Sequence, residues 1–162
     1  MTIEKQAKRR AILIFMLNRS GVLNKISMLI RRKMYNVETI TACTTSQPGI
    51  SRMTLTLRED SDQNMAQVVK QIEKMTEVIS ARELDIAKSF WREVAIVKCE
   101  VEDTDLEKLQ SVYSMDLLDR QDDGQCVAQI AGTSQMIDNF LEAVGDDKVI
   151  EVARSGFTAL EK

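Results

Sequence analysis

Histidine is missing from this sequence of 162 residues. Its absence excludes Ser-His-Asp and Cys-His nucleophile systems, histidine-ligated metals and imidazole acid–base chemistry. Cysteine is scarce as well, because Cys43, Cys99 and Cys126 are far apart and form no CxxC pair. Zinc and dithiol redox sites therefore have no support. An odd number of cysteines in a chain of mixed charge suits a reducing cytoplasm, so we expect a cytoplasmic protein with no metal site.

Aromatic residues make up only 4% of the chain, and the formal net charge is −3. A surface that binds single-stranded nucleic acid needs basic residues interleaved with aromatic ones. The basic clusters Lys8–Arg10 and Arg31–Lys33 and the isolated Arg52 lack that interleaving. We interpret them as solvated surface, since cations near a helix C-terminus suit the helix dipole. The sequence therefore predicts no nucleic-acid partner.

Long apolar runs are also missing. The run Ala11–Leu17 follows a basic start but ends at Asn18, which is too short for a membrane span or a signal peptide. What remains is an ordinary globular composition, with 44% apolar and 29% charged residues. The length allows one large domain or two small ones of about 75–80 residues each.

Hydrophobic periodicity predicts the same order of elements, β-α-β-β-α-β, in each half of the chain. In the first half the expected elements are a strand at 11–17, a helix from Val22, strands at 37–45 and 50–57, a helix capped by Ser61-Asp62 and a strand at 78–84. In the second half they are a strand at 93–101, a helix with the capping box Thr104-x-x-Glu107, strands at 114–118 and 125–130, a helix after Thr133-Ser134 and a strand at 149–152.

Two such units in tandem indicate class α+β, with two ferredoxin-like sandwiches. We expect a polar N-terminal arm at residues 1–8, a first domain at 9–85 and a second at 86–162.

The most informative segment is Asn18-Arg19-Ser20-Gly21-Val22-Leu23, where a strand ends and a helix begins. Free N–H groups at a helix N-terminus attract an anion such as a carboxylate. Gly21 would allow close approach to the backbone, and the amide of Asn18 can both accept and donate. Together these residues would form half of an amino-acid site. The alternative is that Gly21 only makes a tight turn, which Asn18 satisfies.

A second amide, Asn36, opens the next expected strand. It is either part of the same polar site or a residue of an Asx-turn at the entry to the strand. Its neighbours Met34 and Tyr35 are expected to pack in the core. The acidic pairs Asp122-Asp123 and Asp146-Asp147 are expected in surface turns.

The segment NRSGVLNKISMLIRRKMYNVETITACTTSQPGISRMTL resembles the ACT domain of acetolactate synthase small regulatory subunits. The resemblance lies in Asn18-x-x-Gly21-x-Leu23, in Tyr35-Asn36-Val37-Glu38 and in the hairpin Pro48–Thr54, whose SRMT is the most particular part. The second half agrees in order, with Arg92-Glu93, Ala131–Ser134 and Val149–Gly156. The similarity covers residues 9–160.

This resemblance implies a chain that is not an enzyme by itself and that carries no catalytic residues. Members of the family activate the catalytic (large) subunit of acetolactate synthase and confer feedback inhibition by valine, in branched-chain amino-acid (valine, leucine and isoleucine) biosynthesis. The cofactors thiamine diphosphate, Mg and FAD belong to the large subunit, and this chain is expected to hold none.

Family ACT domains pair as homodimers with valine at the interface. Carried over by motif, the backbone around Gly21 and Val22 would take the carboxylate, and Asn36 would come from the partner chain. The residues implied in valine binding are Asn18, Ser20, Gly21, Val22, Leu23, Asn36 and Ile40. The alternative is an amino-acid-responsive transcription regulator, for which no helix-turn-helix segment is expected in this sequence.

Overall fold

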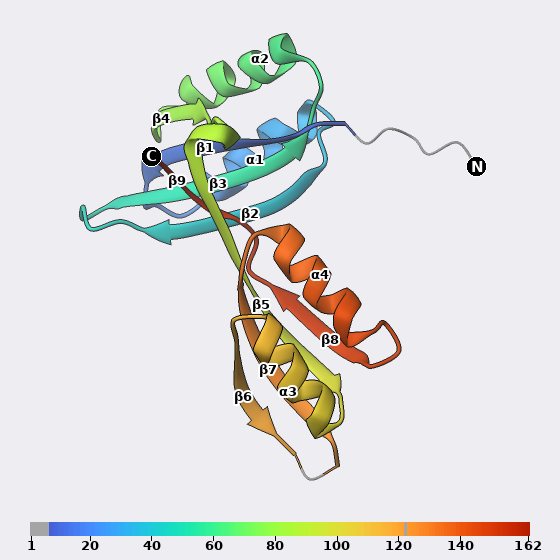
Figure 1. Cartoon of the computed structure of the whole chain (residues 1–162). Coiled ribbons are helices and arrows are strands. Elements are labelled where there is room, and N and C mark those ends of the chain that lie inside the picture. Colours follow the sequence, from blue (N-terminus) through green and yellow to red (C-terminus); the bar gives the residue numbers. More distant parts are fainter. Residues whose placement is uncertain (1–6, 122) are drawn as a thin grey trace. The chain divides into compact units, whose positions relative to one another are not determined.

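The computed structural model describes residues 7–121 and 123–162, which form two compact units (Figure 1). One unit comprises the chain up to Phe90 together with Ala159–Lys162, and the other comprises Trp91–Thr158. Each contains the order β-α-β-β-α-β around an antiparallel sheet, which confirms the predicted α+β class. Residues 1–6 of the expected arm lie outside the described residues.

The first unit has a four-stranded antiparallel sheet in the order β2-β3-β1-β4. Its elements are β1 (Arg9–Leu17), α1 (Val22–Arg32), β2 (Val37–Thr44), β3 (Ile50–Arg58), α2 (Asp62–Glu73), β4 (Val78–Glu83) and the short 3-10 helix η1 (Ile86–Lys88). Ser61 caps α2 as predicted, because its hydroxyl accepts from the N–H of Asn64 at 3.2 Å.

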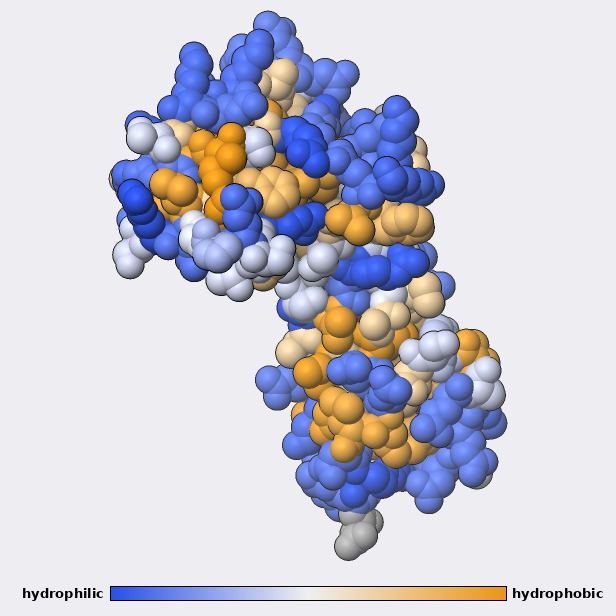
Figure 2. Space-filling view, turned by 90° about the vertical axis from the view of Figure 1, so that its left-hand side faces the viewer, coloured by the Kyte–Doolittle hydropathy of each residue, from blue (hydrophilic) through white to orange (hydrophobic). Residues whose placement is uncertain are grey.

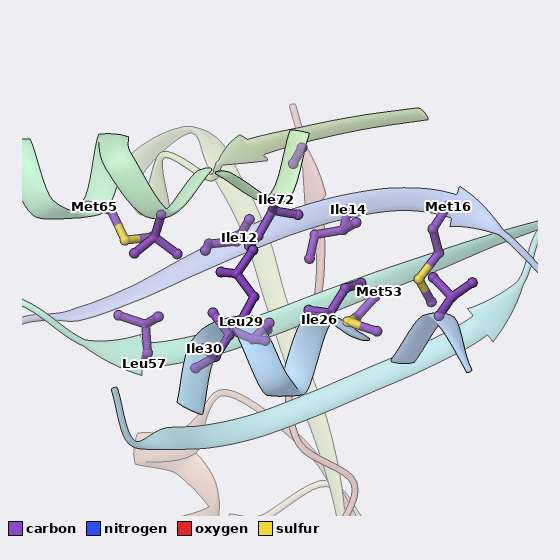
Figure 3. Close-up of a cluster of buried hydrophobic side chains, with 14 residues drawn as sticks. Ile12, Ile14, Met16, Ile26, Leu29, Ile30, Met53, Leu57, Met65 and Ile72 are labelled. Carbon is purple, nitrogen blue, oxygen red and sulfur yellow. The ribbon is translucent and has the colours of Figure 1, made fainter. Parts of the chain in front are cut away.

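The core of the first unit lies between α1, α2 and one face of the sheet (Figure 3). Alternate residues of β1, such as Ile12 and Ile14, point to this face and are fully buried. Residues of α1 at helical spacing, such as Ile26 and Ile30, meet them there. Burial of each such side chain stabilises the fold by about 1.5–3 kcal/mol, so this face is the main source of the unit's stability.

The second unit has the strand order β6-β7-β5-β8, and β9 also pairs with β5. Its elements are β5 (Ser89–Glu100), α3 (Asp103–Val112), β6 (Met115–Arg120), β7 (Gln125–Gly132), α4 (Ser134–Val144) and β8 (Val149–Arg154). The last strand, β9 (Thr158–Glu161), belongs to the first unit from Ala159 onward. The core of the second unit is separate from that of the first unit and is centred on Phe140 and Ile137 of α4. Thr133, which was expected to precede a helix, caps α4, and its hydroxyl accepts from the N–H of Met136 at 3.3 Å.

Three features differ from the expectation. The capping box at Thr104 does not form, because α3 begins at Asp103 with Glu102 as its N-cap. The carboxylates of Asp103 and Asp105 complement the helix dipole in its place. Strand β5 starts at Ser89, earlier than predicted, and β9 was not predicted at all. A strand of four residues is too short to show a two-residue period.

The expected domain boundary after residue 85 lies a few residues before the division that the structure makes after Phe90. The structure also groups Ala159–Lys162 with the first unit rather than the second. The chain therefore leaves the first unit, forms the second and returns.

Two of the three cysteines face each other in the second core. Cys99 of β5 lies opposite Cys126 of β7, and their Sγ atoms are 3.4 Å apart. Burial, followed by the hydrogen bond with Cys126, raises the pKa of the Cys99 thiol to about 12. Cys43 is exposed on β2. Cys99 is therefore a protonated thiol at neutral pH.

We expect iodoacetamide to leave Cys99 and Cys126 unmodified in the native protein and to modify both after unfolding. The thiolate is the reactive form; burial limits access to both thiols and suppresses ionisation of Cys99. Peptide mass spectrometry after labelling at pH 8, with and without denaturant, measures this. Equal labelling of Cys99 in both conditions would contradict the packing described here.

Candidate ligand site at the start of helix α1

The segment between β1 and α1 is held in place by backbone hydrogen bonds. The N–H of Asn18 donates to the carbonyl of Gly49 at 2.8 Å, which ties the end of β1 to the β2–β3 hairpin. The N–H of Leu17 donates to the carbonyl of Glu77 at 2.8 Å, on the side of β4. These contacts fix where α1 begins, while the side chains of Asn18 and Ser20 remain exposed.

The first turn of α1 leaves backbone donors unused. Gly21 is the N-cap residue and has no side chain to accept from them. Within the described chain, the N–H groups of Leu23 and Asn24 have no hydrogen-bond acceptor. The first turn also contains no acidic residue. These donors and the helix dipole create a positive local potential, which favours an anion by about 0.3–1 kcal/mol at an exposed site.

The backbone conformation at position 21 favours glycine, whereas the space around it would accommodate a side chain. The φ of Gly21 is +85°, in the left-handed region, and a Cβ built there would meet no atom within 4 Å. The tight-turn interpretation of Gly21 is therefore correct for this loop. The open space above its backbone is equally compatible with a bound carboxylate, so the two interpretations do not exclude each other.

The other predicted site residues differ in how far their side chains are exposed to solvent. Val22 is buried at 3% exposure and belongs to the core, whereas its neighbour Leu23 is 47% exposed. Ile40, in the middle of β2, is 39% exposed and lies opposite Leu55 in the sheet. Since Leu55 is a core residue, Ile40 is on the face of the sheet that the helices cover.

Asn36 is not brought to the loop within one chain. Leu17 pairs with Ile50 at one end of β3, whereas Val37 pairs with Leu57 at its other end. Asn18 follows Leu17, and Asn36 precedes Val37. Leu17 and Val37 are therefore separated by seven steps of about 3.3 Å, or roughly 23 Å, and the two amides lie beyond them at opposite ends of the sheet. A site that uses both amides needs two chains.

Apolar side chains are exposed on both units (Figure 2), among them Leu23 and Met28 of α1. Met34 is 90% exposed, so the expectation that it packs in the core is wrong. It follows the end of α1 with φ +60°, and its side chain remains in solvent. Tyr35 does pack against the core as expected. Lys25 forms an ion pair with Glu77, which directly precedes β4, so this flank of α1 faces the β4 side of the sheet. Leu23 is on the opposite flank of the helix and therefore faces the β2 side.

Two basic residues that the sequence assigned to solvated surface have specific partners. Arg10 is 5% exposed and pairs with Glu83 and Asp62, which ties β1 to β4 and to the start of α2. The hydrogen bonds to these carboxylates raise the pKa of Arg10. Arg52 donates to the carbonyl of Ala159. Neither contact could be predicted, because both partners lie far away in the sequence.

The corresponding position in the second unit has different chemistry. There α3 begins after Glu102, with Asp103 and Asp105 in its first turn and no glycine at the cap. Its own carboxylates already occupy the electrostatic role that a ligand would fill at α1. Among the described residues, the first turn of α1 therefore lacks the carboxylates that the first turn of α3 contains.

Comparison with known proteins agrees with this division into two units. A model described as "AHAS small subunit-like ACT domain" matches residues 12–80, and one described as "Small subunit of acetolactate synthase" matches residues 92–162. A probable acetolactate synthase small subunit of Methanothermobacter thermautotrophicus is 32% identical, and the match covers 99% of this chain and 96% of that protein. The chain belongs to the acetolactate synthase small-subunit family.

Other members of the family match over similar lengths. The small subunit of acetolactate synthase isozyme 3 of Escherichia coli is 31% identical, over 95% of this chain and 96% of its own. A crystal structure of the acetolactate synthase small subunit from Thermotoga maritima has a TM-score of 0.88 at 23% identity. The match covers 96% of this chain and 98% of that one. The last comparison shows the same fold. The resemblance read from the SRMT hairpin and the glycine loop is thereby confirmed.

Across 7–121 and 123–162, no group of three or more His, Cys, Asp or Glu side chains could hold a metal ion. No helix in the same residues is long and apolar enough to cross a bilayer.

Substitution of Gly21 tests its conformation separately from any ligand. We expect Gly21→Ala to destabilise the protein by about 1 kcal/mol, because alanine is strained at φ +85° although its Cβ has room. Gly21→Asn should cost less, since asparagine tolerates the left-handed region. Urea unfolding measures both. Equal stability of all three proteins would contradict the conformation of this loop.

Proposed function

We propose that this chain is the non-catalytic regulatory subunit of acetolactate synthase. It binds the catalytic subunit, raises its activity and makes it sensitive to feedback inhibition by valine, in the synthesis of branched-chain amino acids. Thiamine diphosphate, Mg and FAD act in the catalytic subunit, with which this chain shares the cytoplasm. Family membership over nearly the whole chain supports this role and disfavours the transcription-regulator alternative.

The observation that carries the valine assignment is the open donor set at the start of α1. The N–H groups of Leu23 and Asn24 are free to bind a carboxylate, and the exposed side chain of Leu23 is apolar. A small branched aliphatic amino acid combines an anionic end with an apolar end of suitable size. The neutral amide of Asn18 can accept from its ammonium group.

A homodimer through β2 would complete this site. β2 is an edge strand of eight residues, VETITACT, without lysine, arginine or proline to prevent pairing. The other edge strand, β4, is shorter and ends in Arg82 and Glu83. Exposed Ile40 on β2 and Leu23 on the flank of α1 add apolar surface on the same side. We therefore place the dimer contact at β2.

Such a dimer would also resolve the separation of the two amides. β1 and β2 run in the same direction, since both are antiparallel to β3. In an antiparallel pair of β2 strands, the start of one lies at the end of the other. The partner's Asn36 would then lie at the same end of the sheet as Asn18. A ligand held by both chains becomes sensitive to the geometry of the dimer.

Linkage explains how such binding regulates the enzyme. Valine inhibits only if it binds the inhibited arrangement more tightly than the active one. A coupling free energy of about 1–3 kcal/mol gives effects of roughly 5–150-fold. A ligand shared by two chains contributes this energy without contacting the catalytic subunit.

A charge on the proposed dimer edge should separate the copies. We expect Ile40→Lys to convert the dimer to a monomer at micromolar concentration, because two lysines would meet beside the two-fold axis. Ile79→Lys is the matched control, since Ile79 is a similarly exposed residue on the other edge strand, β4. Light scattering measures the mass. A dimer that persists in Ile40→Lys and dissociates in Ile79→Lys would move the interface to β4.

Gly21→Asp should abolish valine inhibition and preserve activation of the catalytic subunit. The new carboxylate would compete for the N–H groups of α1 and repel the ligand. Asn36→Ala should weaken valine in the same direction but less, because it removes one hydrogen-bonding group without adding a charge. Inhibition is measured as acetolactate formation by the reconstituted holoenzyme. Binding is measured as the thermal unfolding of this chain with and without valine. A ligand that binds only the native state stabilises it by about 2.7 kcal/mol at a hundredfold excess over Kd.

Gly124→Asp is the matched control for this experiment. Gly124 also has a positive φ, of +92°, but lies in the β6–β7 turn of the second unit. The substitution Gly124→Asp introduces an aspartate at a positive φ, as Gly21→Asp does, but at a position away from α1. If Gly21→Asp folds, activates the enzyme and keeps normal valine sensitivity, the site is wrong.

A further inference from the structure

The SRMT segment of strand β3 has no part in the ligand site described above. Ser51, Arg52, Met53 and Thr54 alternate across the sheet, as strand residues do. Met53 points to the helices and is fully buried in the core. Arg52 and Thr54 therefore belong to the other face, opposite the one on which α1 and α2 pack. The role of the motif must be sought on that face.

The face opposite α1 and α2 is also shielded from solvent. Leu13 of β1 and Thr54 of β3, which lie opposite each other in the sheet, are 3% and 1% exposed. Thr56 and Ala11, the next opposing pair, are fully buried as well. One face of an antiparallel sheet is commonly solvated. Since the residues on this face are buried, another segment of the chain must cover them.

The last residues of the chain contact this face. The guanidinium of Arg52 donates to the carbonyl oxygen of Ala159, and Ala159 is itself 1% exposed. Arg82 of β4, opposite Leu13, donates to the carboxylate of Glu161 at 2.7 Å. The hydrogen bond from Arg82 and the charges of Arg82 and Arg52 lower the pKa of Glu161. Both arginines therefore hold one short segment, Ala159–Lys162.

The end of the chain is also fixed to the residues that lead into β5. The N–H of Lys162 donates to the carbonyl of Lys88 at 2.9 Å, and its ammonium group lies 5.6 Å from the centre of the Phe90 ring. All of these residues are in the first unit. The Arg82–Glu161 pair is half exposed and contributes little. The bond from Arg52 and the burial of Ala159 act together with the pairing of β9 with β5.

This attachment has a consequence for the connection between the units. The chain enters the second unit after Phe90 and leaves it after Thr158, and both neighbouring segments are bound to the first unit. The second unit is thus connected at two points. Without the attachment of Ala159–Lys162, the second unit would be connected to the first only by the chain between Phe90 and Trp91.

We propose that the SRMT motif is a docking site for the chain's own C-terminal strand, with Arg52 as the positioning residue that holds Ala159–Lys162 on the face of the ligand-binding unit opposite α1 and α2. This double connection transmits the state of the first unit to the second. The regulatory part of this inference rests on the proposed function, in which valine binds the first unit. Valine binding itself does not require the attachment, because the site lies at the start of α1, next to the core face.

The attachment is tested directly on the full-length chain by digestion with carboxypeptidase and mass spectrometry. We expect Arg52→Ala to accelerate release of the last three residues at least about tenfold, since a hydrogen bond from a charged donor is lost. Arg52→Lys should restore part of the protection, because an ammonium group can still donate to one carbonyl. Arg58→Ala is the matched control. Arg58 is on the same strand and face but contacts Glu38 and the carbonyl of Ala7.

The regulatory consequence is tested with the reconstituted holoenzyme and the same variants. Arg52→Ala should retain the thermal shift with valine and the activation of the catalytic subunit, and should lose most of the valine inhibition. A chain that stops after Thr158 should behave in the same way. Glu161→Ala, which changes one exposed side chain, should give a smaller effect in the same direction, and it remains informative if Arg52→Ala fails to fold.

Each result decides a separate point. Unchanged carboxypeptidase protection in both Arg52→Ala and Glu161→Ala would overturn the docking site. A released C-terminus with normal valine inhibition would overturn its role in transmission. If the unmodified protein shows neither a thermal shift nor inhibition with valine, the proposed function fails, and the protection assay still decides whether Arg52 holds the strand.

Discussion

The nine-residue antiparallel pairing of β1 with β3 is the constraint on which the first unit depends. It puts one set of alternate residues, including Ile14 and Met53, against the helices, and the other set, including Leu13 and Thr54, on the opposite face. A shift of the register by one residue would exchange the two sets. The pairing also determines where β1 ends, and therefore where the N-terminus of α1 and its free donors lie.

The two units show how one topology supports different chemistry. In each, the first strand leads into a helix whose N-terminus opens at the same point of the fold. In the first unit that N-terminus has Gly21 and no carboxylate, whereas in the second it has Glu102, Asp103 and Asp105. The fold positions the helix, and a few side chains decide whether it can accept an anion. A single chain can thus contain one ligand-binding unit and one unit of another role.

The proposed regulation follows from what a single chain leaves incomplete. One copy has β2 at the edge of its sheet, and it separates Asn18 from Asn36 by the length of the sheet. Both features are resolved by a second copy in antiparallel pairing. A ligand that contacts both copies then gains affinity only in the correct dimer geometry, which is the physical requirement for an effector that acts at a distance.

The sequence by itself determined the class of fold, the order of the elements up to β8, the helix cap at Ser61 and the glycine loop, because each depends on residues close together in the chain. It also identified the family, since the SRMT hairpin and the glycine loop are local motifs. It misplaced Met34 and the start of α3, where backbone conformation and local charge outweighed periodicity. Only the tertiary structure showed that Arg10 is buried between Glu83 and Asp62 and that Arg52 holds the last strand. Those partners are separated by 52 to 107 positions in the chain, so their contacts arise from folding and leave no local pattern to read.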